Sequence, residues 1–111
     1  MSGAFEKRQK GFESKWAHDE ELRFKVFARR NKLLGLWAAG ELGLKGDATE
    51  AYAKEVVAAD FQKAGDEDVF EKVRDDLKAK GVGISEHVLR LKMAELIETA
   101  KKQIEQEVAK K

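Results

Sequence analysis

The feature that most constrains the fold is the absence of proline, combined with glycines that separate stretches of helix-forming residues. Proline removes a backbone donor and breaks helices, so a chain without it can form long uninterrupted helices. Alanine, glutamate, lysine and leucine are abundant, and all four favour helix. The alternation of β-branched residues that marks half-buried strands is absent. The sequence therefore predicts an all-α fold.

Capping residues and glycines divide the chain into four predicted helices. Side chains that can accept hydrogen bonds from a first helical turn occur at Asp19, Asp47, Asp66 and Ser85. Glycine can end a helix because it adopts positive φ without steric cost. The predicted helices span about residues 19–42, 48–64, 67–80 and 86–109. Short connections between them favour an antiparallel four-helix bundle formed by residues 19–111.

The first predicted helix carries two apolar stripes when residues are placed about 100° apart. One stripe has Leu22, Val26, Leu33 and Trp37, and the other has Phe24, Phe27, Leu34 and Leu42. A helix with two such faces contacts more than one partner, so we expect it to be central. Glycines inside this helix, at Gly35 and Gly40, indicate close approach of a neighbouring helix.

Residues 1–18, which we call the aromatic segment, have a different pattern. Phe5, Phe12 and Trp16 are spaced by seven and four residues, so they would lie on one side of a helix. Burying three aromatic side chains does not offset the entropy of ordering the whole segment. We therefore expect a mobile helical segment that becomes ordered when a partner covers its aromatics. The alternative is that these aromatics fold back on Ile104 and Val108 of the last helix.

The composition argues against several classes of function. A net charge of +1 does not favour bulk attraction to nucleic acid or to anionic membranes. The longest uncharged stretch is far shorter than the ~20 apolar residues of a membrane-spanning helix, and the charged N-terminus does not resemble a secretory signal. Without cysteine and with only two histidines, the sequence offers no metal site and no catalytic pair. We therefore expect a protein that is not an enzyme.

Basic side chains gather at Arg23, Lys25, Arg29, Arg30 and Lys32. Such a run can hold the phosphate of a nucleotide. Acidic residues one turn away counter it, and the wheel places no aromatic stacking surface beside it. A solvated or internally paired face is the favoured interpretation, and the alternative is a small regulatory module that binds ADP or ATP weakly. Lys101-Lys102 and Lys110-Lys111 are likewise expected on solvated surface.

Two stretches, residues 18–25 and 28–39, resemble the signature of a known family. They read His-Asp-Glu-Glu-Leu-Arg-Phe-Lys and Ala-Arg-Arg-Asn-Lys-Leu-Leu-Gly-Leu-Trp-Ala-Ala. The family is that of the zeta subunits, small inhibitors of the F-type ATP synthase of alphaproteobacteria. The resemblance implies a four-helix bundle whose mobile N-terminal segment inserts at a catalytic interface of the α, β and γ subunits of the synthase head. Such insertion would block ATP hydrolysis.

By position, the resemblance assigns the inhibitory contacts to Phe5, Arg8, Phe12, Trp16 and His18. Trp16 stands where the family pattern has phenylalanine, and Val26-Phe27 is bulkier than the usual pair. The resemblance further implies a cytoplasmic protein that reaches the inner membrane only through the synthase head, without inserting directly. We expect no resident cofactor, no metal and no nucleic-acid partner.

Overall fold

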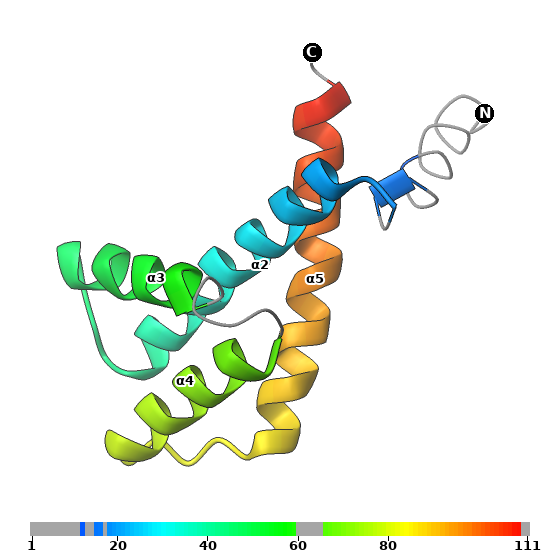
Figure 1. Cartoon of the computed structure of the whole chain (residues 1–111). Helices are drawn as coiled ribbons and strands as arrows, with labels where there is room; N and C mark the ends of the chain where they lie inside the picture. The colour runs from blue at the N-terminus through cyan, green and yellow to red at the C-terminus, as the bar shows by residue number, and fades with distance from the viewer. Residues whose placement is uncertain (1–11, 13–14, 17, 60–65, 110–111) are drawn as a thin grey trace, which may run out of the picture.

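The computed structural model describes residues 12, 15, 16, 18–59 and 66–109, and Figure 1 shows how they are arranged. The helices are α2 (Glu20–Glu41), α3 (Asp47–Ala59), α4 (Asp66–Ala79) and α5 (Glu86–Ala109). Over these ranges the chain forms no strand, so the predicted all-α bundle is confirmed. None of the four helices is long and apolar enough to cross a membrane.

Two of the predicted helix starts are capped as the sequence indicates. The N–H of Leu22 donates to Asp19 Oδ1 at 3.0 Å at the start of α2. The N–H of Val88 donates to Ser85 Oγ at 3.1 Å at the start of α5. Each bond satisfies a donor that the helix itself leaves unpaired.

The other two helix starts differ from the prediction. Asp47 and Asp66 are the first residues of α3 and α4 and do not precede them. Carboxylates in a first turn still stabilise a helix because they face the positive end of its dipole. The predicted continuation of α3 through Phe61 to residue 64 lies outside the described residues.

Glycines end α2 and α4 in the same way. Gly43 has φ of 79°, and the next N–H, that of Leu44, donates to the carbonyl of Ala39 at 2.9 Å. Gly81 has φ of 77°, and the N–H of Val82 donates to the carbonyl of Leu77 at 2.9 Å. This six-to-one bond across a left-handed residue is the Schellman motif, which glycine adopts without strain.

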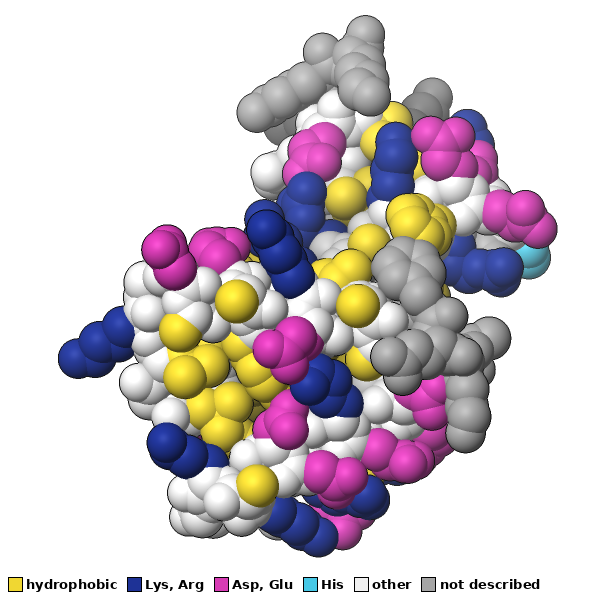
Figure 2. All heavy atoms as spheres, turned by 60° about the vertical axis from the view of Figure 1, so that its left-hand side comes forward, with side chains coloured by type: hydrophobic (Ala, Val, Ile, Leu, Met, Phe, Trp, Pro, Cys, Tyr) yellow, Lys and Arg dark blue, Asp and Glu magenta, His cyan; other side chains and the backbone are white. Residues whose placement is uncertain are grey.

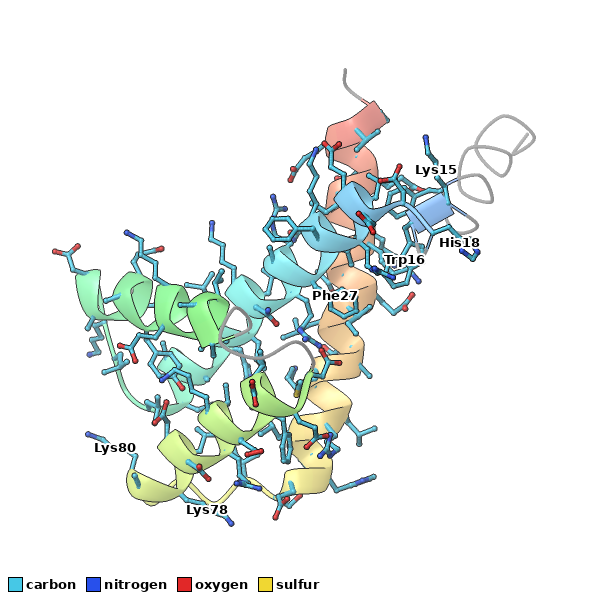
Figure 3. All side chains as sticks on the ribbon, in the orientation of Figure 1. Lys15, Trp16, His18, Phe27, Lys78 and Lys80 are labelled. Carbon is cyan, nitrogen blue, oxygen red and sulfur yellow. The ribbon has the colours of Figure 1, made fainter. Side chains whose placement is uncertain are left out.

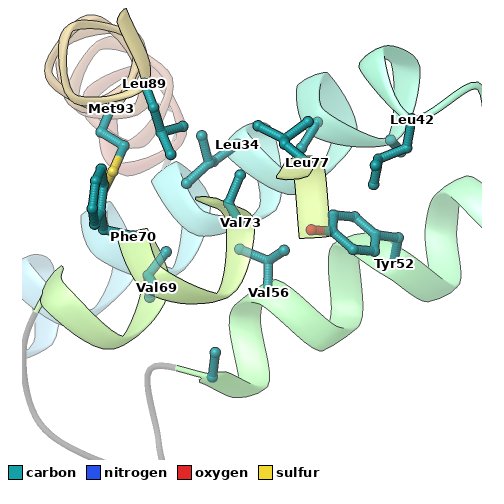
Figure 4. Packing of buried hydrophobic residues seen from close by; sticks show 13 residues of the cluster. Leu34, Leu42, Tyr52, Val56, Val69, Phe70, Val73, Leu77, Leu89 and Met93 are labelled. Atoms are coloured by element: carbon teal, nitrogen blue, oxygen red, sulfur yellow. The ribbon is translucent and has the colours of Figure 1, made fainter. Parts of the chain in front are cut away.

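The central position predicted for the first helix is confirmed, because α2 contacts α3, α4 and α5. A main core fills the space between α2, α3, α4 and the first half of α5 (Figure 4). It consists of Leu34, Ala38, Ala39, Leu42, Tyr52, Val56, Ala59, Val69, Phe70, Val73, Leu77, Leu89 and Met93. The second predicted stripe of α2 is wrong at one position, since Phe24 is 57% exposed.

The two glycines inside α2 have different surroundings. A Cβ added at Gly35 would lie 2.6 Å from the Cα of Ala53 in α3, so the close approach predicted there is confirmed. A Cβ added at Gly40 would meet nothing within 4 Å, so the same expectation is wrong for Gly40.

A polar network joins α3 to α4 beside the main core. The Tyr52 hydroxyl donates to Asp76 Oδ2 at 2.8 Å, and Lys72 Nζ donates to Asp76 and to Glu55 at 3.1 Å each. Burial and the hydrogen bond to Asp76 raise the pKa of Tyr52. Burial alone would lower the pKa of Lys72, but its bonds to Glu55 and Asp76 outweigh this and raise that pKa. Tyr52 and Lys72 therefore keep their protons to a higher pH in the folded state than in the unfolded state.

Candidate functional site: an aromatic segment and a basic groove

A second apolar cluster lies where the start of α2 meets the second half of α5, and we call it the α2/α5 cluster. It consists of Phe12, Leu22, Val26, Ala100 and Ile104, with Trp16 and Leu33 packed against it. Phe12 is only 9% exposed. Phe12 and Trp16 thus pack on the bundle at Ile104, as the alternative for these aromatics expects. Val108, the other residue of that alternative, is 41% exposed and is not part of this cluster.

Trp16 docks beside Phe12 through two further contacts. Its ring centroid lies 6.1 Å from that of Phe27 in α2, with the planes tilted by 52°. The Nζ of Lys101 in α5 lies 5.1 Å from the Trp16 ring centroid, within the range of a cation–π interaction. Figure 3 shows Trp16 turned inward towards α5 and Phe27, whereas Lys15 and His18 point outward.

Lys101 was expected on solvated surface, and that expectation is wrong. Lys101 is only 8% exposed, and its Nζ lies 3.1 Å from Glu98 Oε2. The stem of Lys101 is covered at the α2/α5 cluster while its charge keeps a carboxylate partner. Sequence reasoning missed this residue because a lysine late in a helix has an ordinary surface explanation. Lys102 is exposed as expected, and Lys110-Lys111 lie outside the described residues.

The chain turns sharply between Trp16 and α2. The N–H groups of His18 and Asp19 both donate to the carbonyl of Lys15, at 3.1 and 3.0 Å. Asp19 itself is extended, with φ of −99° and ψ of 113°, before it caps α2. The aromatic segment and α2 are therefore not one continuous helix, and a single extended residue separates them.

Of the predicted inhibitory residues, the structure brings together Phe12 and Trp16 and leaves His18 exposed at the turn. Phe5 and Arg8 lie outside the described residues, as do residues 13, 14 and 17. The predicted mobility of residues 1–18 stays a prediction.

The five basic residues of α2 do not form one face. Arg30 is fully buried, with its side chain in the bundle. Its Nη2 lies 2.7 Å from Asp66 Oδ1, and its Nε donates to Asn31 Oδ1 at 2.8 Å. Its Cζ lies 5.4 Å from the Phe27 ring centroid. Its prediction as a phosphate ligand is wrong, because a ligand in solvent cannot reach it. Arg23 is exposed and does not line the groove described next.

The remaining three cations, Lys25, Arg29 and Lys32, line a groove of about 440 Å³ between α2, α3 and α5. Lys25 Nζ lies 3.2 Å from Glu21 Oε1, and Arg29 Nη2 lies 2.6 Å from Glu107 Oε2. The exposed ring of Phe24 lines the same groove, so an aromatic surface does accompany these cations. On the face shown in Figure 2, basic and acidic side chains are mixed and no region is basic alone.

The chain is similar to a known protein family and to a solved structure. The family model described as ATPase inhibitor subunit zeta matches residues 1–103. A structure solved by solution NMR is 50% identical in sequence, with a TM-score of 0.69 over 78% of this chain and 98% of that chain. No protein with a curated description matches. Within the described residues, no group of three or more metal-ligating side chains could hold an ion. Because the family model spans nearly the whole sequence, this chain belongs to the ATPase inhibitor subunit zeta family.

Proposed function

We propose that this chain inhibits ATP hydrolysis by an F-type ATP synthase by inserting the aromatic segment between the α, β and γ subunits of the head. Membership of the inhibitor family supports the inhibitory role. The observation that carries the insertion is the docking of Phe12 and Trp16 on a cluster separate from the main core. A segment held there can leave the bundle while the core between α2, α3 and α4 stays packed.

The mechanism we propose is steric. Once helical, residues 4–18 form a rod of roughly 20 Å at ~1.5 Å per residue. Phe5, Phe12 and Trp16 would anchor the rod in apolar pockets, and Arg8 and His18 would make polar contacts beside them. A stiff rod wedged beside a rotating subunit blocks rotation without any chemistry by the inhibitor. The protein would then act in the cytoplasm and reach the membrane only through the synthase head.

The test is an ATP hydrolysis assay of purified synthase head with added inhibitor. The intact chain should inhibit, and a chain lacking residues 1–18 should not. That deletion uncovers the α2/α5 cluster, so a modest fall in melting temperature is expected while the helical content of the bundle persists. Inhibition that survives the deletion would contradict the insertion.

A point variant makes the same test without shortening the chain. Trp16→Ala should raise the half-inhibitory concentration by about tenfold or more, the scale of an interfacial aromatic anchor. Leu91→Ala is the matched control. Leu91 is an exposed apolar side chain in the first half of α5, whereas the α2/α5 cluster uses the second half. Equal potency of the two variants would show that Trp16 is not an anchor.

Nucleotide binding is a second candidate, and the groove lined by Lys25, Arg29, Lys32 and Phe24 favours it. Cations can hold phosphate groups and an exposed ring can stack on a base. A titration with ADP, followed by NMR chemical shifts, should give saturable shifts at these four residues that Lys32→Gln weakens. Inorganic phosphate is the control ligand, and shifts of equal size with phosphate would mean that no base is recognised. Flat spectra to millimolar ADP would remove the candidate.

A further inference from the structure

The aromatic side chains proposed to enter the synthase already have a binding site on their own bundle. Phe12 completes the α2/α5 cluster, in which Val26 and Ala100 are fully buried and Ile104 is 3% exposed. Trp16 lies between Phe27 and the Lys101 ammonium. One ring cannot occupy two pockets, so docking on the bundle and docking on the synthase exclude each other.

We infer that the α2/α5 cluster is an autoinhibitory site that competes with the synthase for Phe12 and Trp16. This inference rests on the proposed function, because it needs those two residues as anchors in the target. The structure is then the closed state of the inhibitor. Opening removes Phe12 and Trp16 from the α2/α5 cluster and frees the aromatic segment for the partner.

The backbone bonds at the turn allow this opening without loss of the cap of α2. The cap of α2, formed by Asp19 Oδ1 and the N–H of Leu22, lies on the helix side of the turn. The two bonds that close the turn go to the carbonyl of Lys15, on the other side. Among the described residues, opening breaks those two bonds and the ring contacts of Phe12 and Trp16, and α2 keeps its capped first turn.

Competition of this kind lowers the apparent affinity for the synthase by the fraction of molecules that are open. If nine molecules in ten are closed, complete release of the segment increases potency by about tenfold. Substitutions in the receiving pocket on α5 should therefore make the protein a stronger inhibitor, although they leave the aromatic segment untouched. A merely structural contact would not have this effect.

The first measurement detects the closed state directly. In the full-length free chain, nuclear Overhauser effects are expected between the Phe12 ring protons and the methyl groups of Val26, Ala100 and Ile104. Their absence, with the bundle folded, overturns the inference. Adding the synthase head should weaken these signals in proportion to the amount of complex formed.

The second measurement compares half-inhibitory concentrations in the hydrolysis assay. Ile104→Ala widens the pocket for Phe12 and should lower the half-inhibitory concentration by up to about tenfold. Ile97→Ala is the matched control, because Ile97 is on the same helix and belongs to neither cluster. The control should leave potency unchanged.

A milder pair covers the case in which Ile104→Ala does not fold. Lys101→Gln removes the cation over the Trp16 ring and should lower the half-inhibitory concentration by about two- to fivefold. The exposed neighbouring variant Lys102→Gln should leave it unchanged. Unchanged or weaker inhibition by both pocket variants overturns the competition. Failure of every chain, the wild type included, to inhibit would instead overturn the proposed function, and the Overhauser effects would still report whether the closed state exists.

Discussion

Replacing Gly35 by alanine tests whether the backbone of α3 is seated directly against α2. The added Cβ would lie 2.6 Å from the Cα of Ala53, 3.2 Å from its Cβ and 3.3 Å from the Cβ of Val56. Carbon atoms pack at about 3.5–4.0 Å, so the two helices must separate by roughly 1 Å. The nearest atom is backbone, and a rotamer change cannot remove the clash.

The magnitude follows from two opposing effects. Alanine in place of glycine inside a helix is worth about 1 kcal/mol in favour of folding. Overpacking a filled interface costs about 1–3 kcal/mol or more, and separating α2 from α3 also opens space around Val56 in the main core. We expect Gly35→Ala to lower the free energy of unfolding by about 2 kcal/mol, equivalent to roughly 10 °C in melting temperature.

The assay is urea and thermal unfolding followed by circular dichroism, and the chain supplies its own control. Gly40→Ala is the same substitution in the same helix, where the new Cβ meets nothing within 4 Å. It should stabilise the fold by about 0.5–1 kcal/mol. Ala53→Gly should not restore Gly35→Ala fully, because the closest contact is with the Cα that glycine retains. If Gly35→Ala proves as stable as Gly40→Ala, the backbone of α3 does not pack directly against Gly35.

Other predictions follow from the polar contacts of the bundle. The pKa of Tyr52 is raised above its ordinary value of 10.0 in the folded state. The contribution of its neutral hydroxyl to the free energy of unfolding is therefore complete below pH 10.0 and is lost as the pH rises through the folded-state pKa. Tyr52→Phe should therefore destabilise the protein by about 1 kcal/mol at pH 7, and the difference from wild type should shrink in thermal melts above pH 10.0. Asp66→Asn should cost about 2 kcal/mol in urea unfolding, more than Arg30→Met, since it leaves a buried cation without its carboxylate. Ser85→Ala should cost about 1 kcal/mol by the same measurement, because it removes the cap of α5.

Local features of the fold could be predicted from the sequence because their causes lie within a few residues. The caps at Asp19 and Ser85 and the turn at Gly43 each depend on one side chain, or on one φ angle, and on a backbone group at most five residues away. The central position of α2 also followed from its own pattern of apolar residues. These predictions needed no knowledge of which helices touch.

The predictions that failed concern tertiary neighbours. A wheel treats Phe24 and Phe27 alike, although Phe27 is covered by Trp16 and Phe24 faces a groove. The burial of Arg30 depends on Asp66, 36 residues away, which an analysis of one helix at a time cannot pair with it. Sequence reasoning identified the cations of α2 but could not tell which of them a ligand could reach.

The aromatic segment shows why a weak pattern can still carry a function. Its three aromatics are too few to order the whole segment alone, yet Phe12 is buried because it packs with side chains of α2 and α5 in the α2/α5 cluster. The proposed exchange between this site and the synthase favours weak apolar periodicity, because a strongly amphipathic helix would bind the bundle permanently. The marginal apolar pattern of residues 1–18 is therefore consistent with the reversible docking on the α2/α5 cluster that we propose.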